Sequence, residues 1–259
     1  MSHIGSKLII KHIFNRNSQP YSLKHSLFPP SEISDFFIWS SSFHKTEFVS
    51  ENVYALLSGK KQKVEHYFIF YKPDGEILKT YSHYSDKFIS EIKLPFISQS
   101  YKYISFTHQI IHYESFNNFL ERLGFSSKLN IIPQSRGYTK YFSNKKAIGA
   151  CVHGNFGGLA SENIKTAKQR NLHVYTIPYN FFNKYEYHLV FNNPTNDELE
   201  IEARFLNNEN ITRIYLNPMG TNLIIVNNYS GPISFTSKLP ICRPIIFQNP
   251  PPKTKNFDV

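Results

Sequence analysis

Two stretches of the chain, HYFIFYKPDGEIL at residues 66–78 and YHLVFNNPTNDEL at residues 187–199, resemble each other and decide the predicted fold. Each stretch opens with a run of apolar and aromatic residues that is typical of a strand, and each continues into a turn that contains proline. When the two stretches are aligned, Pro73 coincides with Pro194, and a phenylalanine three positions earlier also coincides. The match indicates that one structural unit is used twice.

The similarity continues downstream, where FISEIKLP at residues 88–95 aligns with NITRIYLN at residues 210–217 at almost the same offset. Each half therefore reads as a strand, a turn, a strand, a polar turn and a strand that ends in leucine. A repeat of this length is the size of a domain rather than of a solenoid unit. We predict a mainly β protein with two tandem antiparallel β-sandwich domains related by internal duplication, and one short helix inserted in the first.

Composition and local patterns agree with a β-rich chain. Hydrophobic residues make up 41% of the sequence and aromatic residues 16%, which excludes a disordered protein. The turn at Lys72–Gly75 has proline and glycine at the positions that a tight hairpin turn requires. Residues 115–124 instead place apolar side chains at steps of three and four, which predicts a helix. Residues 53–57 are interpreted as a further strand.

The domain boundaries are predicted from changes in composition. Residues 1–32 form an N-terminal arm that ends near two consecutive prolines, and residues 33–160 form the first sandwich. Residues 161–171 carry a weak helical pattern, and residues 172–249 form the second sandwich. Residues 250–259 begin with three prolines and form a C-terminal tail.

Charge and cysteine content restrict the partners that we expect. The formal net charge is +10, but the basic residues are scattered and no groove-reading motif accompanies them, so we do not expect nucleic acid as the partner. Two cysteines make no disulfide framework, and no apolar run approaches the length of a membrane span. We therefore predict a cytoplasmic protein, with a homo-oligomer possible. His108 and His112 could bind one metal only if they lay on a helix, and the residues around them predict a strand. We therefore predict no metal and no cofactor.

The segment GACVHGNFGGLA at residues 149–160 is the first candidate for a ligand site. In a strand over residues 147–153, Cys151 and His153 share one face, and the glycines that follow let a ligand approach the backbone. These glycines match neither the phosphate-loop pattern nor the dinucleotide pattern. An arginine beside aromatic residues can also bind a carboxylate or phosphate. The candidate ligand-binding residues are Arg136, Cys151, His153, Gly154, Asn155 and Gly157.

The sequence holds no group of residues with catalytic spacing, and this favours a binding or assembly protein without catalysis. Its ligand would be a glycan, a small anion or a protein partner. The alternative is an enzyme that acts on a sugar or acyl substrate, with a site around Cys151, His153 and the glycine loop 154–158. Trp39, the only tryptophan, is interpreted as a core or domain-interface residue rather than a sugar platform.

Overall fold

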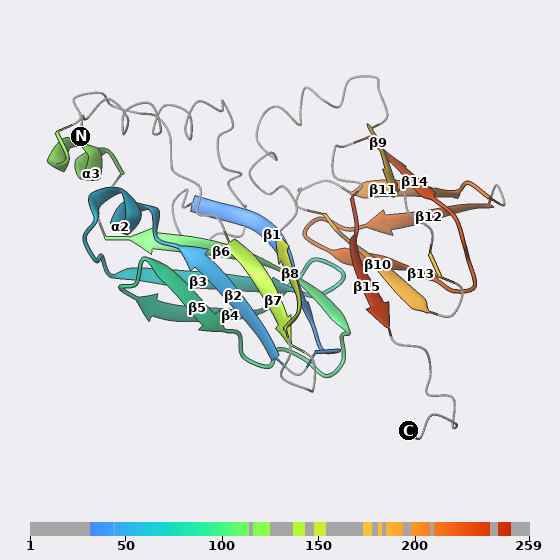
Figure 1. The fold of residues 1–259 in the computed structure, drawn as a ribbon, viewed down its shortest axis with the longest axis horizontal. Helices are drawn as coiled ribbons and strands as arrows, with labels where there is room; N and C mark the ends of the chain where they lie inside the picture. Colours follow the sequence, from blue (N-terminus) through green and yellow to red (C-terminus); the bar gives the residue numbers. More distant parts are fainter. Residues whose placement is uncertain are drawn as a thin grey trace.

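The protein is mainly β, as predicted (Figure 1). A computed structural model describes residues 32–43, 45–113, 116–124, 137–142, 148–153, 173–177, 181–182, 185–193, 198–207, 210–238 and 243–249. Within these residues the strands form four antiparallel sheets, accompanied by two short helices. Most of the predicted arm (residues 1–31), the weak helical pattern at residues 161–171 and the tail (residues 250–259) lie outside the described residues.

The two sheets of the first half contain four strands each. Sheet A has the order β1 (Glu32–Ser40), β6 (Tyr103–His112), β3 (Val64–Tyr71) and β4 (Ile77–Ser85). Sheet B has the order β5 (Ile89–Lys93), β2 (Lys45–Glu51), β7 (Gly137–Phe142) and β8 (Ile148–His153).

The two sheets of the second half are built from the remaining seven strands. Sheet C has the order β12 (Asn210–Leu216), β11 (Leu199–Phe205), β14 (Ile233–Ser237) and β9 (His173–Ile177). Sheet D has the order β13 (Thr221–Val226), β10 (Glu186–Asn192) and β15 (Ile245–Asn249).

Alternation along the strands directs one face of each sheet into an aromatic core. In the first half, Phe37, Phe68 and Phe106 of sheet A meet Phe48 of sheet B in one buried cluster. The ring of Phe48 lies 4.7 Å from that of Phe37 and 5.4 Å from that of Phe68, both edge-on. A second cluster joins apolar side chains of sheets C and D in the same way. Trp39 is buried in the first cluster, in agreement with its predicted core role.

The two stretches that suggested the repeat differ in their strand pairing. In the first half, β3 and β4 form a hairpin across the predicted turn, in which the Gly75 N–H donates to the Lys72 carbonyl over 2.9 Å. In the second half, β10 and β11 belong to different sheets, and β11 pairs with β12 instead. The sequence similarity therefore does not extend to the pairing of these strands.

The helix predicted at residues 115–124 is present as α3 (Phe116–Arg122), but the strand predicted at residues 53–57 is wrong. Those residues form α2 (Val53–Ser58), because Asn52 caps its first turn by accepting a hydrogen bond from the Ala55 N–H over 3.1 Å. Gly59 ends the helix in the left-handed conformation, with φ of 67°. Asn52 and Gly59 therefore favour a helix between them, although the composition of residues 53–57 favours a strand.

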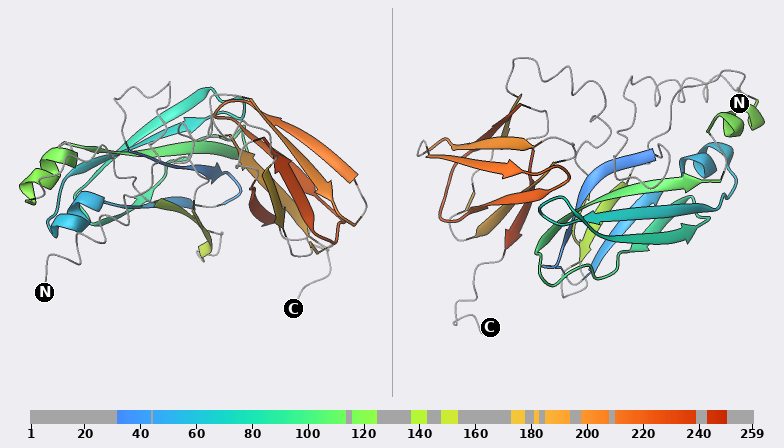
Figure 2. Two further views of the ribbon diagram at one scale, coloured as in Figure 1. Left: turned by 90° about the horizontal axis from the view of Figure 1, so that it is seen from above. Right: turned by 180° about the vertical axis from the view of Figure 1, so that it is seen from behind.

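The two halves contact each other through turns, and both views in Figure 2 show them side by side. The N–H of Thr221, at the start of β13, donates to the Pro73 carbonyl of the hairpin turn over 3.0 Å. The side chain of Met219 enters a cluster on sheet A that includes Tyr71. The Ser105 hydroxyl donates to the Met219 carbonyl over 2.8 Å. Backbone and side-chain contacts thus fasten the second half to sheet A.

Candidate functional site

The predicted pair Cys151 and His153 lies on β8, an edge strand of sheet B, and both side chains are exposed on one face. Across the ladder, Lys140 of β7 is paired with Cys151 and Tyr138 with His153. The His153 and Tyr138 rings are 5.7 Å apart. Val152 faces the other way and packs against a buried cluster, as alternation requires.

This arrangement places the two side chains together without giving them the geometry of a catalytic dyad. Side chains two positions apart on a strand are separated by about 7 Å, which is beyond hydrogen-bonding range. The ammonium group of Lys140 is already paired with the Glu91 carboxylate over 2.5 Å. The other predicted ligand residues, Arg136, Gly154, Asn155 and Gly157, lie outside the described residues.

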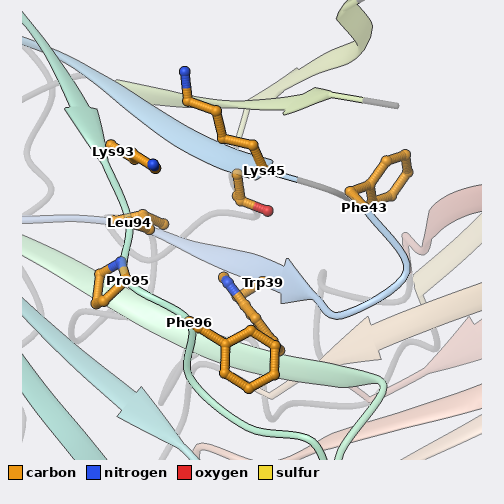
Figure 3. Close-up of a pocket in the computed structure, with 8 residues that line it drawn as sticks. Trp39, Phe43, Lys45, Lys93, Leu94, Pro95 and Phe96 are labelled. Carbon is orange, nitrogen blue, oxygen red and sulfur yellow. The ribbon is translucent and has the colours of Figure 1, made fainter. Parts of the chain in front are cut away.

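A cavity of about 410 Å³ opens elsewhere, at one end of sheets A and B (Figure 3). Two stretches of the chain supply its walls: the end of β1 with the following loop and the start of β2, and the end of β5 with the residues after it. The residues that line it are Trp39, Phe43, Lys45, Thr46, Lys93, Leu94, Pro95 and Phe96.

Strand register explains why these residues meet. β2 and β5 pair side by side, and beyond the last paired residues the Leu94 N–H donates to the Thr46 carbonyl over 3.0 Å. Alternation turns Thr46 toward the core side of β2, the side of Phe48, and turns Lys45 outward. The cavity therefore lies where the apolar interior of the sheets meets their charged outer surface.

The aromatic end of the cavity is formed by Trp39 and Phe96. Their rings are in edge contact, with centroids 5.7 Å apart and planes at 83°. Trp39 is only 4% exposed, whereas Phe96 is 61% exposed and offers a ring surface to a ligand. Within the described residues, the Trp39 indole N–H makes no hydrogen bond, so this donor has no protein acceptor there. This end combines an apolar surface with one unpaired donor.

The opposite end is positively charged, and Figure 3 shows Lys45 and Lys93 on the far side of Leu94 from the two rings. Lys45 forms an ion pair with Glu47, and its ammonium group also lies 4.9 Å from the centre of the Phe142 ring. Lys93 has no ion pair within the described part of the chain. Lys45, Lys93 and Glu47 together carry a net charge of about +1, which a ligand with one negative charge would balance.

The wall between these ends contains an unpaired hydroxyl group. Thr46 is 4% exposed, and its Oγ1 atom is buried without a hydrogen-bond partner among the described residues. Leaving a buried hydroxyl unpaired costs about 1–3 kcal/mol. The Thr46 hydroxyl is therefore sealed inside the wall and does not face the open space of the cavity. Sequence alone does not indicate this site, because its residues come from two stretches that are far apart in the chain, residues 39–46 and 93–96.

Two buried histidines form a second polar feature, inside the core of the first half. The His66 Nδ1 and His108 Nε2 atoms are 2.9 Å apart, so one ring donates to the other. Burial, followed by the charges of His83 and His112, lowers the pKa of His66 to about 4. Burial also holds the pKa of His108 well below its usual range. Both rings are therefore neutral at physiological pH.

His108 and His112, whose spacing would suit a metal on a helix, contact different neighbours in the structure. Both lie on the strand β6, where His108 contacts His66 while His112 stacks on Tyr54 with ring centroids 3.5 Å apart. Among the described residues, no group of three or more His, Cys, Asp or Glu side chains could hold a metal ion. In the same part of the chain, no helix is long and apolar enough to cross a membrane.

Comparison with known proteins gives no family for the chain. No protein-family model matches it, and no curated protein is significantly similar to it. The geometry of the cavity is therefore the basis for assigning a function.

Proposed function

We propose that the protein is a non-catalytic binding protein, and that its ligand is a small anion held in the cavity between Trp39 and Lys93. The observation that carries the proposal is that one cavity combines the exposed ring of Phe96 with the exposed ammonium group of Lys93, which has no ion pair among the described residues. An unneutralised positive charge beside an exposed aromatic ring supports an anionic ligand with an apolar surface.

We also propose that the chain is organised as two tandem β-sandwich domains, over residues 33–160 and 172–249. The aromatic cluster shared by sheets A and B supports the first sandwich, and the cluster shared by sheets C and D supports the second. Internal duplication stays a prediction from the sequence, because the aligned strands pair with different neighbours. The binding site then belongs to the first sandwich.

An enzyme centred on Cys151 and His153 is the weaker alternative. Both side chains are exposed on one face, which a catalytic pair requires. However, their spacing along the strand prevents a direct hydrogen bond, and the nearby Lys140 is occupied by Glu91. The cavity combines an exposed ammonium group that has no ion pair among the described residues with an exposed aromatic ring, so it has the stronger claim to a ligand.

The proposal is tested with the natural fluorescence of the protein, because Trp39 is the only tryptophan and it lines the cavity. Acetate, benzoate, D-glucuronate and D-glucose are titrated separately while Trp39 emission is recorded, and calorimetry measures each affinity. We expect at least one carboxylate to saturate the wild type, and Lys93→Gln and Phe96→Ala to weaken that binding about tenfold or more.

Lys79→Gln is the matched control, because Lys79 is an exposed lysine on β4 that does not line the cavity. This variant should bind like the wild type. Saturable binding that is unchanged by both cavity substitutions would place the site elsewhere. If no compound in the panel binds, the proposed function is wrong for small carboxylates.

A further inference from the structure

We propose that the first half is a pH-sensitive switch, in which proton uptake by the buried pair His66 and His108 separates sheets A and B while sheets C and D stay together. Neither histidine lines the cavity, so the switch does not depend on the proposed function. Three features of the structure support it: the position of the pair, the charges around it, and the different composition of the second core.

Strand register places four histidines on one face of sheet A. His66 of β3 lies opposite His83 of β4. His108 of β6 lies opposite Phe68 of β3, and alternation returns His112, at the end of β6, to the same face. Phe68 belongs to the buried cluster that sheets A and B share, so the four histidines lie on the face that sheet B covers.

The closed structure has room for only one hydrogen between the two buried rings. His66 and His108 are both 0% exposed, and their facing Nδ1 and Nε2 atoms are 2.9 Å apart, so one nitrogen carries the hydrogen and the other accepts it. If both rings became positively charged, both of these nitrogens would carry a hydrogen, and the two N–H groups would point at each other. A doubly charged pair therefore needs water around its rings in place of the packing of sheet B.

Sheet B and α2 present uncharged groups to this face. The ring centroid of Phe48 on β2 lies 4.6 Å from that of His108. The same face of sheet B carries the buried residues Ser50 of β2 and Ser90 of β5, which are opposite each other in the ladder. Tyr54 of α2 stacks on the histidine that ends β6. The charged residues of β2, β5 and β7 alternate onto the outer face of sheet B.

Within sheet A, the charges that act on His66 are also unfavourable to its protonation. Burial, followed by the charges of His83 and His112, lowers the pKa of His66 to about 4. Glu65 is adjacent in sequence but faces the other side of the sheet, where its carboxylate accepts a hydrogen bond from the Ser82 hydroxyl over 2.7 Å. A protonated His66 would therefore be buried without a carboxylate among the described residues beside it.

The core of the second half is built differently. The buried cluster that sheets C and D share contains no histidine among its described members. His188 of β10 is also buried, but its Nε2 atom lies 2.6 Å from the Glu186 carboxylate, which would offset a positive charge on the ring. We therefore expect acid to open the first half at a pH at which the second half is still folded.

Hydrogen exchange of the wild type, measured by mass spectrometry and corrected for the intrinsic effect of pH, tests the switch. Because the opened pair takes up two protons that the closed pair excludes, the equilibrium constant for opening should rise by up to about 100-fold per pH unit below about pH 6. Exchange in β3 and β6 should therefore accelerate between pH 7 and about pH 4.5, while β10 and β11 keep their protection. Trp39, the only tryptophan and part of the first core, should shift its emission to the red as the opened form accumulates.

The double variant His66→Phe with His108→Phe removes both titratable groups and keeps two rings in the core. The acid midpoint of its Trp39 emission should lie at least about one pH unit below that of the wild type. His153→Gln is the matched control, because it replaces an exposed histidine of β8, and it should leave the midpoint unchanged.

An unchanged midpoint in the double variant would overturn the role of the pair. If both halves lose protection at the same pH, acid unfolds the whole chain and the switch is wrong. If the double variant does not fold, exchange of the wild type decides, because unchanged protection of β3 and β6 between pH 7 and about pH 4.5 also contradicts the switch.

Discussion

Replacing Thr46 by valine should make the protein more stable, although the residue is buried and polar. Valine has almost the shape of threonine, so the substitution exchanges a hydroxyl for a methyl group without opening a cavity. In most proteins, removing a buried hydroxyl destabilises the fold because a hydrogen bond is lost. Here Oγ1 has no partner among the described residues, so only the cost of burying it is removed.

The size of the effect follows from that cost. An unpaired buried hydroxyl disfavours the folded state by about 1–3 kcal/mol, and the new methyl group gains apolar burial instead. We expect the free energy of unfolding to rise by about 1–2 kcal/mol. For a chain of 259 residues this corresponds to an increase in Tm of about 2–8 °C.

Urea denaturation followed by Trp39 emission, together with calorimetry, measures the change. Thr221→Val should stabilise the protein by a similar amount, because its hydroxyl is also buried without a partner in the described structure. A loss of 1 kcal/mol or more in Thr46→Val would show that the hydroxyl is paired inside the protein. That result would overturn the description of Thr46 as an unpaired buried residue.

Two further predictions concern the contact between the halves and the buried histidines. Gly75→Ala should destabilise the protein by at least about 2 kcal/mol more than Gly59→Ala, measured by urea denaturation. Both glycines have positive φ, but only at Gly75 would the new Cβ lie 1.8 Å from the Pro218 carbonyl oxygen; equal losses would contradict the turn contact. The unfolded state takes up a proton at His66 below pH 6.5, whereas the folded state resists this until about pH 4. Stability should therefore fall by about 3 kcal/mol from this group as pH falls from 6.5 to 4, and a flat profile of unfolding free energy over that range would refute it.

Much of the fold of the first half could be predicted from local sequence. The alternation over residues 64–71 and the proline and glycine in the following turn specify β3, β4 and their connection, because side chains on a strand must alternate between faces. The apolar spacing after residue 115 likewise specifies α3. These patterns act over a few neighbouring residues, which is why sequence alone reveals them.

Features that depend on distant residues could not be predicted in the same way. The similar stretches at residues 66–78 and 187–199 suggested equivalent hairpins, but tertiary contacts decide which strand becomes the neighbour, and β11 pairs with β12. In the segment at residues 53–57, the capping signal of Asn52 and Gly59 was present and outweighed the apolar composition. Together, these two residues predict a helix between them.

The candidate site was missed for the same reason. Trp39, Thr46 and Phe96 carry no motif in common, and only the pairing of β2 with β5 and the packing of Trp39 on Phe96 bring them to one cavity. The segment that the sequence favoured as a ligand site, around Cys151 and His153, forms an exposed sheet face. An unpaired buried hydroxyl can be recognised only when all its neighbours in space are known.

A crystal structure of the protein, grown with the carboxylate that saturates it in solution, shows directly whether the cavity is the binding site. We expect the ligand in the cavity, with its carboxylate within hydrogen-bonding distance of Lys93 and its apolar surface against Phe96. A ligand bound beside Cys151 and His153, or an empty cavity at a saturating concentration, would overturn this assignment.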